Sequence, residues 1–123
     1  METRKDASLT ALRPAILSLG VSDLLVSERF YRDVLGLPTQ RVGEDLEVRW
    51  PEFILQISAR PPAGRGKFHF GFRVDHADDV DRWAERLRAN GAENVSGPFG
   101  DNGERKVYFI DPEDFEISIF FTP

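Results

Sequence analysis

The two histidines are the side chains of this sequence best suited to acid–base or metal chemistry near neutral pH. His69 lies in a segment where large apolar and other residues alternate, so a strand there turns it, with Lys67 and Arg73, to one face. His76 follows that segment, at the entry of a predicted helix. We therefore expect His69 rather than His76 to face a site. The pattern leaves open whether His69 is catalytic or only binds or supports structure.

Composition excludes several other chemistries. The 123-residue chain has no cysteine, so disulfides, thiolate zinc sites and a cysteine nucleophile are ruled out. Its net charge is −5, and it lacks the clustered basic residues that nucleic acid requires. No apolar run approaches the roughly 20 residues that span a bilayer. We therefore expect a cytoplasmic protein without nucleic-acid or membrane partners.

Hydrophobic periodicity predicts an α+β fold in which one element order occurs twice. Amphipathic helices are expected at residues 24–35 and 77–90, each followed by a glycine that ends it. Alternation and turn residues predict the strands, at residues 14–21, 37–42, 46–50, 53–58, 67–74, 92–95, 105–110 and 115–121. The order strand–helix–strand–strand–strand is thus repeated, which favours duplication of one unit.

The expected organisation is a single domain that follows a flexible N-terminal arm. The arm covers residues 1–13 and the domain residues 14–121. Within the domain we expect module one at 14–58 and module two at 67–121. The linker, residues 59–66, contains two prolines and two glycines.

Three segments resemble one known family. They are VSDL at 21–24 with RFYRDVLGL at 29–37, HFGFRVD at 69–75, and YFIDPEDFEI at 108–117. Taken in order and with their spacing, they resemble the vicinal oxygen chelate superfamily, which includes glyoxalase I, bleomycin-resistance proteins and extradiol dioxygenases. The resemblance implies that two tandem β-α-β-β-β modules form a curved mixed sheet around a ligand groove. It also implies helices on the outer face and a homodimer.

The resemblance also locates the family's metal-ligand positions, at Ile16, Gln56, His69 and Ser118. Isoleucine offers no lone pair, and serine and glutamine are weak neutral ligands, whereas catalytic metals require three good donors or a two-His-one-carboxylate set. We therefore expect no metal cofactor. A divalent metal remains the alternative, with Glu47 or Glu116 as the missing donor.

Strand parity predicts which residues line the groove, and Trp50 is added as a surface on which a planar ligand could stack. The predicted lining is Ile16, Ser18, Trp50, Ile54, Gln56, Ser58, Lys67, His69, Arg73, Ser118 and Phe120. This half-apolar set suits a small organic ligand. Lys67 and Arg73 are candidates for binding a carboxylate or phosphate.

Three functions remain open at this point. The first is a metal-free dimer that binds a small molecule, in the manner of bleomycin-resistance proteins. The second is a divergent metal-dependent lyase, isomerase or ring-cleaving dioxygenase, so the sequence does not decide whether the protein is an enzyme. The third is a protein-interaction module whose groove is closed by side chains.

Overall fold

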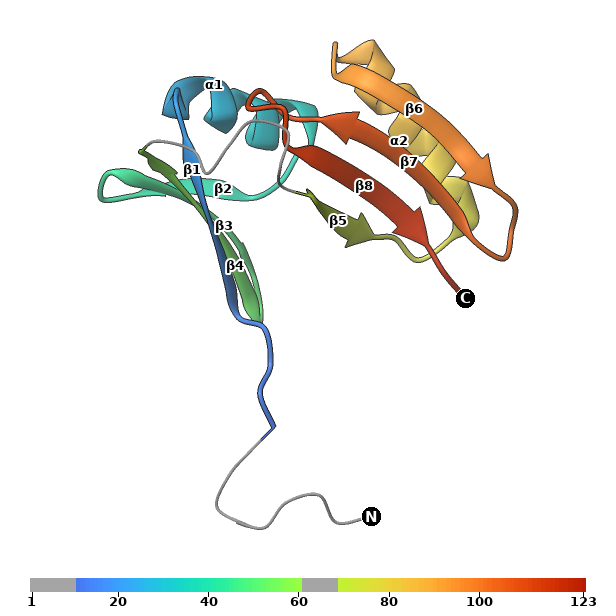
Figure 1. Cartoon of the computed structure of the whole chain (residues 1–123), viewed down its shortest axis with the longest axis horizontal. Helices are drawn as coiled ribbons and strands as arrows, with labels where there is room; N and C mark the ends of the chain where they lie inside the picture. The colour runs from blue at the N-terminus through green and yellow to red at the C-terminus, as the bar shows by residue number, and fades with distance from the viewer. Residues whose placement is uncertain (1–10, 61–68) are drawn as a thin grey trace.

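The computed structural model describes residues 11–60 and 69–123 and contains the same element order twice (Figure 1). Module one consists of β1 (Ile16–Val21), α1 (Leu24–Arg29), a π-helical continuation η1 (Phe30–Val34), β2 (Thr39–Val42), β3 (Asp45–Trp50) and β4 (Phe53–Ala59). Module two consists of β5 (His69–Arg73), α2 (Ala77–Ala89), β6 (Glu93–Gly100), β7 (Arg105–Ile110) and β8 (Glu116–Phe121). The predicted α+β class and the duplicated order are confirmed.

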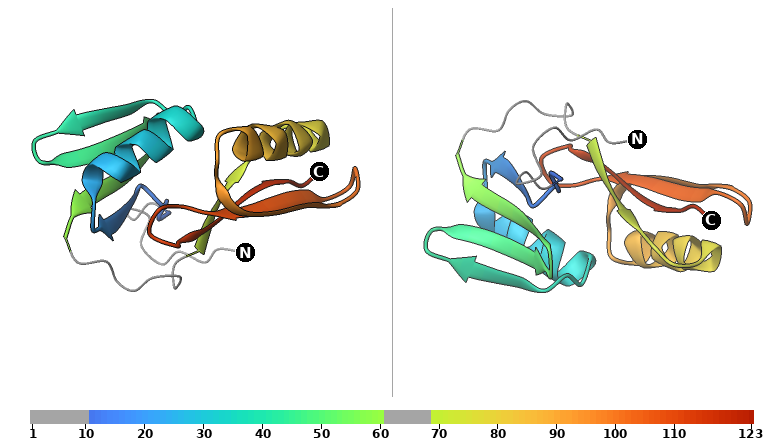
Figure 2. Two further views of the ribbon diagram at one scale, coloured as in Figure 1. Left: turned by 90° about the horizontal axis from the view of Figure 1, so that it is seen from above. Right: turned by 90° about the horizontal axis from the view of Figure 1, so that it is seen from below.

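The described strands form two four-stranded mixed sheets, whereas the family resemblance implied one curved mixed sheet. Their orders are β1-β4-β3-β2 and β5-β8-β7-β6, and in each the first strand runs parallel to its neighbour. The two open sheets lie side by side, one in each module (Figure 2). The reason lies in the pairing: β1 and β5 are edge strands, and no pairing among the described residues joins one module to the other.

Local sequence explains where the helices begin and end. Asp23 caps α1 because its Oδ1 accepts the backbone N–H groups of Leu25 and Val26. The helix continues through η1 to Gly36, whose φ of 68° favours glycine. Helix α2 buries its regularly spaced Val80, Ala84 and Leu87.

The last sheet differs from prediction at one edge. Strand β6 extends to Gly100 and includes Pro98, whereas the sequence predicted a strand that ends at residue 95. Proline has no N–H to donate, yet it is tolerated here because β6 is an edge strand. The predicted arm lies outside the described residues at 1–10, as does the predicted linker at 61–66.

The helices cover one face of each sheet, as predicted, and a shared core joins the modules. Leu19, Leu46 and Ile57 are buried in module one, and Val107, Ile117 and Ile119 in module two. The rings of Phe30 and Phe109 connect the two groups, with centroids 6.2 Å apart. No helix in the described ranges is long and apolar enough to span a membrane.

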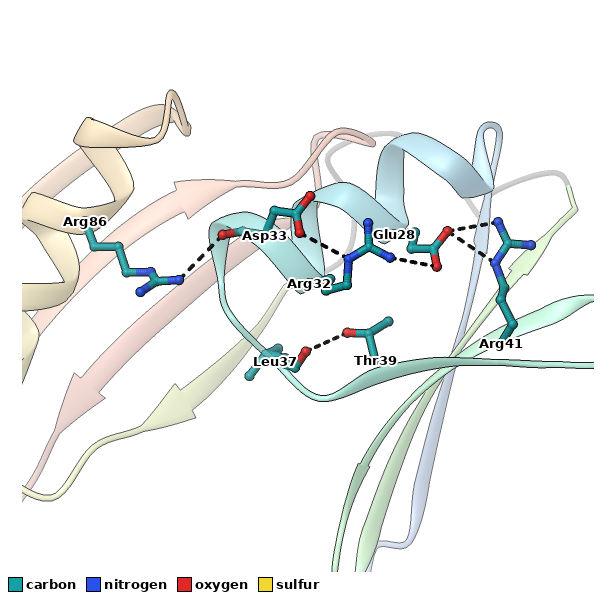
Figure 3. Close-up of polar contacts among 7 residues, drawn as sticks. All are labelled: Glu28, Arg32, Asp33, Leu37, Thr39, Arg41 and Arg86. Carbon is teal, nitrogen blue, oxygen red and sulfur yellow. Dashed lines mark hydrogen bonds and ion pairs between the residues drawn. The ribbon is translucent and has the colours of Figure 1, made fainter.

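Polar contacts also join the modules. The Arg86 guanidinium, on α2, donates from Nε to the Val34 carbonyl at 3.0 Å. Its Nη2 donates to the Asp33 carbonyl at 3.5 Å (Figure 3). Within module one, the Glu28 carboxylate accepts from both Arg32 and Arg41 and so ties α1 to β2 (Figure 3). These contacts tie η1 to α2 of the other module and α1 to β2 of its own.

Candidate functional site

Each sheet has an open face, defined here as the face turned away from its own helix. Alternation along the strands places Leu19 and Ile57 toward α1, so Ser18 and Gln56 lie on the open face of module one. Likewise Ile117 and Ile119 are in the core, which places Glu116 and Ser118 on the open face of module two. The two open faces hold most of the residues that the sequence selected.

On module one, a row of polar side chains crosses three strands. Ser18, Gln56 and Glu47 are register partners on β1, β4 and β3. Ser18 Oγ donates to Gln56 Oε1 at 2.9 Å, and Gln56 Nε2 donates to Asp45 Oδ2 at 3.4 Å. Glu47 is buried and accepts from Arg49 Nε at 2.8 Å. Both polar ends of the Gln56 amide are therefore already engaged.

On module two, His69 pairs with a carboxylate. His69 and Glu116 are register partners on the parallel strands β5 and β8, and His69 Nδ1 lies 2.8 Å from Glu116 Oε1. Next to this pair, Ser118 is buried against Gly71, where a Cβ would collide with Ser118 Oγ. Glycine at position 71 therefore allows Ser118 to lie flat between β5 and its own strand.

Aromatic side chains continue this face. The Tyr108 ring lies 6.4 Å from the His69 ring and 6.4 Å from the Phe99 ring, by centroids. A cavity of about 340 Å³ borders Tyr108, Phe99 and Lys106. The Arg73 guanidinium lies over the Phe120 ring at 5.8 Å, so this charge is held at the face by a cation–π contact.

The remaining predicted lining residues are distributed unevenly. Ile16 and Ile54 are partners at one end of β1 and β4, and Ile16 is 56% exposed. Ser58 is buried and accepts from Arg60. Lys67 lies outside the described residues. No hydrogen bond within the described residues joins the selected side chains of module one to those of module two.

Trp50 lies elsewhere than the sequence suggested. It pairs with Phe53, on the face that carries Leu55, and so points away from the open face. There it separates two cavities at the module junction, of about 190 and 170 Å³, and lies 5.9 Å from the Phe72 ring. The reason is parity: Trp50 lies three positions after Glu47, so their side chains leave β3 on opposite faces.

The four family positions do not fit a divalent metal. Ile16 brings no donor, and its register partner is Ile54 rather than Gln56. Gln56 and Ser118 offer only neutral oxygens, and the Gln56 amide already bonds Ser18 and Asp45, which leaves His69 Nε2 as the one good donor of the four. Within residues 11–60 and 69–123, no three His, Asp or Glu side chains are grouped closely enough to hold an ion. These four positions therefore do not supply the three good donors that a catalytic metal requires.

Sequence reasoning named Glu116 only as a possible metal donor, did not identify it as the partner of His69, and missed Tyr108. The strand register is what identifies both residues. Once β5, β8 and β7 are neighbours, His69 stands opposite Glu116, and Tyr108 stands opposite Ser118. Strand order cannot be derived from a single strand's alternation, so these neighbours emerged only from the fold.

Comparison with known proteins agrees with this architecture. The family model described as the glyoxalase/bleomycin resistance protein/dioxygenase superfamily matches residues 13–119. A search of curated proteins finds no match.

Solved structures share the fold along nearly the whole chain. Lactoylglutathione lyase from Agrobacterium tumefaciens is 25% identical, with a TM-score of 0.71, over 91% of this chain and 95% of its own. A glyoxalase/bleomycin resistance protein/dioxygenase from Nocardioides is 26% identical, with a TM-score of 0.71, over 94% and 88%. TnmS3, an antibiotic-binding protein from a Streptomyces species, is 24% identical, with a TM-score of 0.75, over 94% and 99%.

Proposed function

Because the chain belongs to the glyoxalase/bleomycin resistance protein/dioxygenase superfamily, we propose that it is a metal-free homodimer that binds a small organic ligand on its open faces. One observation carries the metal-free part. Of the four family ligand positions, Ile16 offers no donor, Gln56 and Ser118 offer only neutral oxygens, and His69 offers one ring nitrogen, Nε2, because its Nδ1 lies against Glu116. One nitrogen donor is too few for a divalent metal, but it is suited to hydrogen-bonding an organic ligand.

The chemistry of the open faces supports an amphiphilic ligand. Module two offers the rings of Tyr108, Phe99 and Phe120 beside the charges of Arg73 and Lys106. Aromatic area with a few placed polar groups is typical of small-molecule sites. The likeness to TnmS3 shows the fold alone, and the proposal for this chain depends on the side chains just named.

The metalloenzyme alternative finds less support. It needs Glu47 or Glu116 as an additional donor, but Glu47 is paired with Arg49, and Glu116 with His69. Each pair would have to break before either carboxylate could join a metal site. A lyase, isomerase or dioxygenase reaction that depends on a metal is therefore the second candidate, and the same experiment tests it.

The experiment is a thermal-shift screen of amphiphilic organic compounds, with and without EDTA, on protein purified without chelator. We expect a compound that raises the Tm equally in both conditions and elemental analysis with substoichiometric Zn, Ni, Fe and Mn. The variant Arg73→Ala should weaken binding, whereas the matched control Arg82→Ala, a helix-face arginine paired with Asp79, should not. Stoichiometric metal and binding abolished by EDTA would refute the proposal.

The assembly and the location have separate tests. Light scattering should give twice the 14.0 kDa mass of the chain if it is a homodimer. The edge strands β1 and β5 offer unpaired backbone for such an interface. A monomer at micromolar concentration would remove this part of the proposal. The proposal also places the protein in the cytoplasm, and cell fractionation checks that.

A further inference from the structure

The His69–Glu116 pair has a geometry that determines which histidine nitrogen is available. Glu116 Oε1 lies 2.8 Å from Nδ1, and the two residues are direct partners in the parallel register of β5 and β8. An ionised carboxylate is an acceptor only, so a neutral imidazole must place its proton on Nδ1 to form this bond. The other nitrogen, Nε2, then carries a lone pair and acts as an acceptor.

The surroundings of this acceptor are aromatic. The Tyr108 ring neighbours the His69 ring, and the Phe99 ring neighbours Tyr108, both at 6.4 Å between centroids. Beyond them lies the cavity of about 340 Å³ bordered by Glu104 and Lys106, which form a 3.9 Å ion pair. The face therefore presents aromatic rings beside the His69 Nε2 acceptor, while the nearby charges of Glu104 and Lys106 offset each other.

We infer that Glu116 is a positioning residue that holds His69 in the Nδ1–H form, so that Nε2 accepts from a planar ligand bearing an N–H or O–H donor. The inference deepens the proposed function, on which its ligand part rests. The ring of the ligand lies against Tyr108 and Phe99, and its donor faces His69. A site built around such a bond discriminates against analogues that lack the donor, because the acceptor would be left unpaired.

The first test needs no ligand. Long-range ¹H–¹⁵N NMR distinguishes the two neutral tautomers of histidine. The spectra are recorded on the full chain, at a pH high enough for imidazole to be neutral. We expect the Nδ1–H form for His69 in the native protein. Glu116→Gln, which keeps an acceptor oxygen, should retain much of it, whereas Glu116→Ala should shift His69 to the Nε2–H form that free histidine prefers.

His76 is the internal control, because its side chain forms no capping bond at the start of α2. Its tautomer should be the same in all three proteins. Circular dichroism verifies that each variant is folded, which is expected because both side chains of the pair are about half exposed, 53% and 54%. A native His69 in the Nε2–H form, or a tautomer unchanged by Glu116→Ala, overturns the positioning role.

The second test addresses the ligand class with a matched pair of probes, indole and N-methylindole, which differ in the ring N–H donor. Indole should shift the resonances of His69 and Tyr108 at several-fold lower concentration than N-methylindole, and Glu116→Ala should remove that difference. Equal shifts from the two probes, or no shift from either, overturn the ligand class. Neither test depends on metal content. A failure of this inference is therefore distinguishable from a failure of the metal-free proposal, which elemental analysis decides.

Discussion

Tyr31 Oη lies 2.8 Å from Asp111 Oδ2, and this bond connects the π-helical turn of module one to the β7–β8 turn of module two. Both residues are buried. The other carboxylate oxygen, Oδ1, accepts the backbone N–H groups of Glu113 and Phe115. One aspartate thus orders its own turn and anchors the neighbouring module.

Removing the Tyr31 hydroxyl should therefore destabilise the whole domain. Tyr31→Phe keeps the ring, which lies 5.3 Å from the Phe30 ring, but leaves Asp111 Oδ2 without its partner. An unsatisfied buried acceptor costs about 1–3 kcal/mol. We expect urea denaturation to show a loss of that size in the free energy of unfolding. A loss below 0.5 kcal/mol, roughly the floor for a typical hydrogen bond, would contradict the anchoring role.

The pH dependence of stability should show the burial of Asp111. Burial raises the pKa of Asp111, although hydrogen bonds from Tyr31 and the backbone oppose that shift. An aspartate in the unfolded chain has a pKa near 4, so just above pH 4 the folded state holds more protons than the unfolded state. The contribution of Asp111 to the free energy of unfolding therefore falls as the pH rises through its folded pKa. The stability advantage of the native protein over Asp111→Asn should therefore shrink across that interval, as urea titrations at successive pH values can measure.

The hydrogen bond between Tyr31 and Asp111 also predicts a loss of stability at alkaline pH. Burial, followed by the nearby Asp111 charge, raises the pKa of Tyr31 well above its ordinary value. The folded state therefore keeps this proton where the unfolded chain loses it, and the contribution of Tyr31 declines as pH rises from about 10. As the pH is raised in alkaline denaturation, the difference in free energy of unfolding between the native protein and Tyr31→Phe should therefore become smaller. A difference constant to the end of the alkaline transition would contradict this assignment.

Gly71 should tolerate no side chain while Ser118 is present. A Cβ at position 71 would collide with Ser118 Oγ and lie 3.2 Å from Phe120 Cε1. Overpacking of this kind costs about 1–3 kcal/mol. The double variant Gly71→Ala/Ser118→Ala should lose less stability than the sum of the single changes, because Ser118→Ala removes the colliding oxygen. Strict additivity in a double-mutant cycle would show that the collision is relieved in another way.

Arg86 should matter more for stability than a neighbouring arginine on the same helix. Its Nε donates to Val34 O in module one, and its guanidinium lies 5.3 Å from the Trp83 ring centroid. We expect Arg86→Ala to lower the free energy of unfolding by about 1 kcal/mol. Arg82→Ala removes only an exposed ion pair with Asp79 and should cost about half as much or less. Equal effects of the two substitutions would contradict a specific role for Arg86 between modules.

The sequence by itself determined which faces are apolar and where the helices end. The spacing of Val80, Ala84 and Leu87 predicts α2, because burial on a helix repeats every 3.6 residues, and Gly36 ends the first helix because its positive φ suits glycine. The same alternation correctly directed Ser18 and His69 away from the core. These are local properties, which a few neighbouring residues decide.

Only the tertiary structure decided which residues meet. Glu116 lies 47 positions from His69 and Asp111 lies 80 positions from Tyr31, and each pair forms because strand order and register bring distant segments together. Trp50 faces the module junction because of its parity relative to Glu47, and the eight strands form two sheets because β1 and β5 remain edges. Hydrophobic pattern fixes the direction of a side chain along its own element, but its partner depends on pairing between elements, which the pattern does not encode.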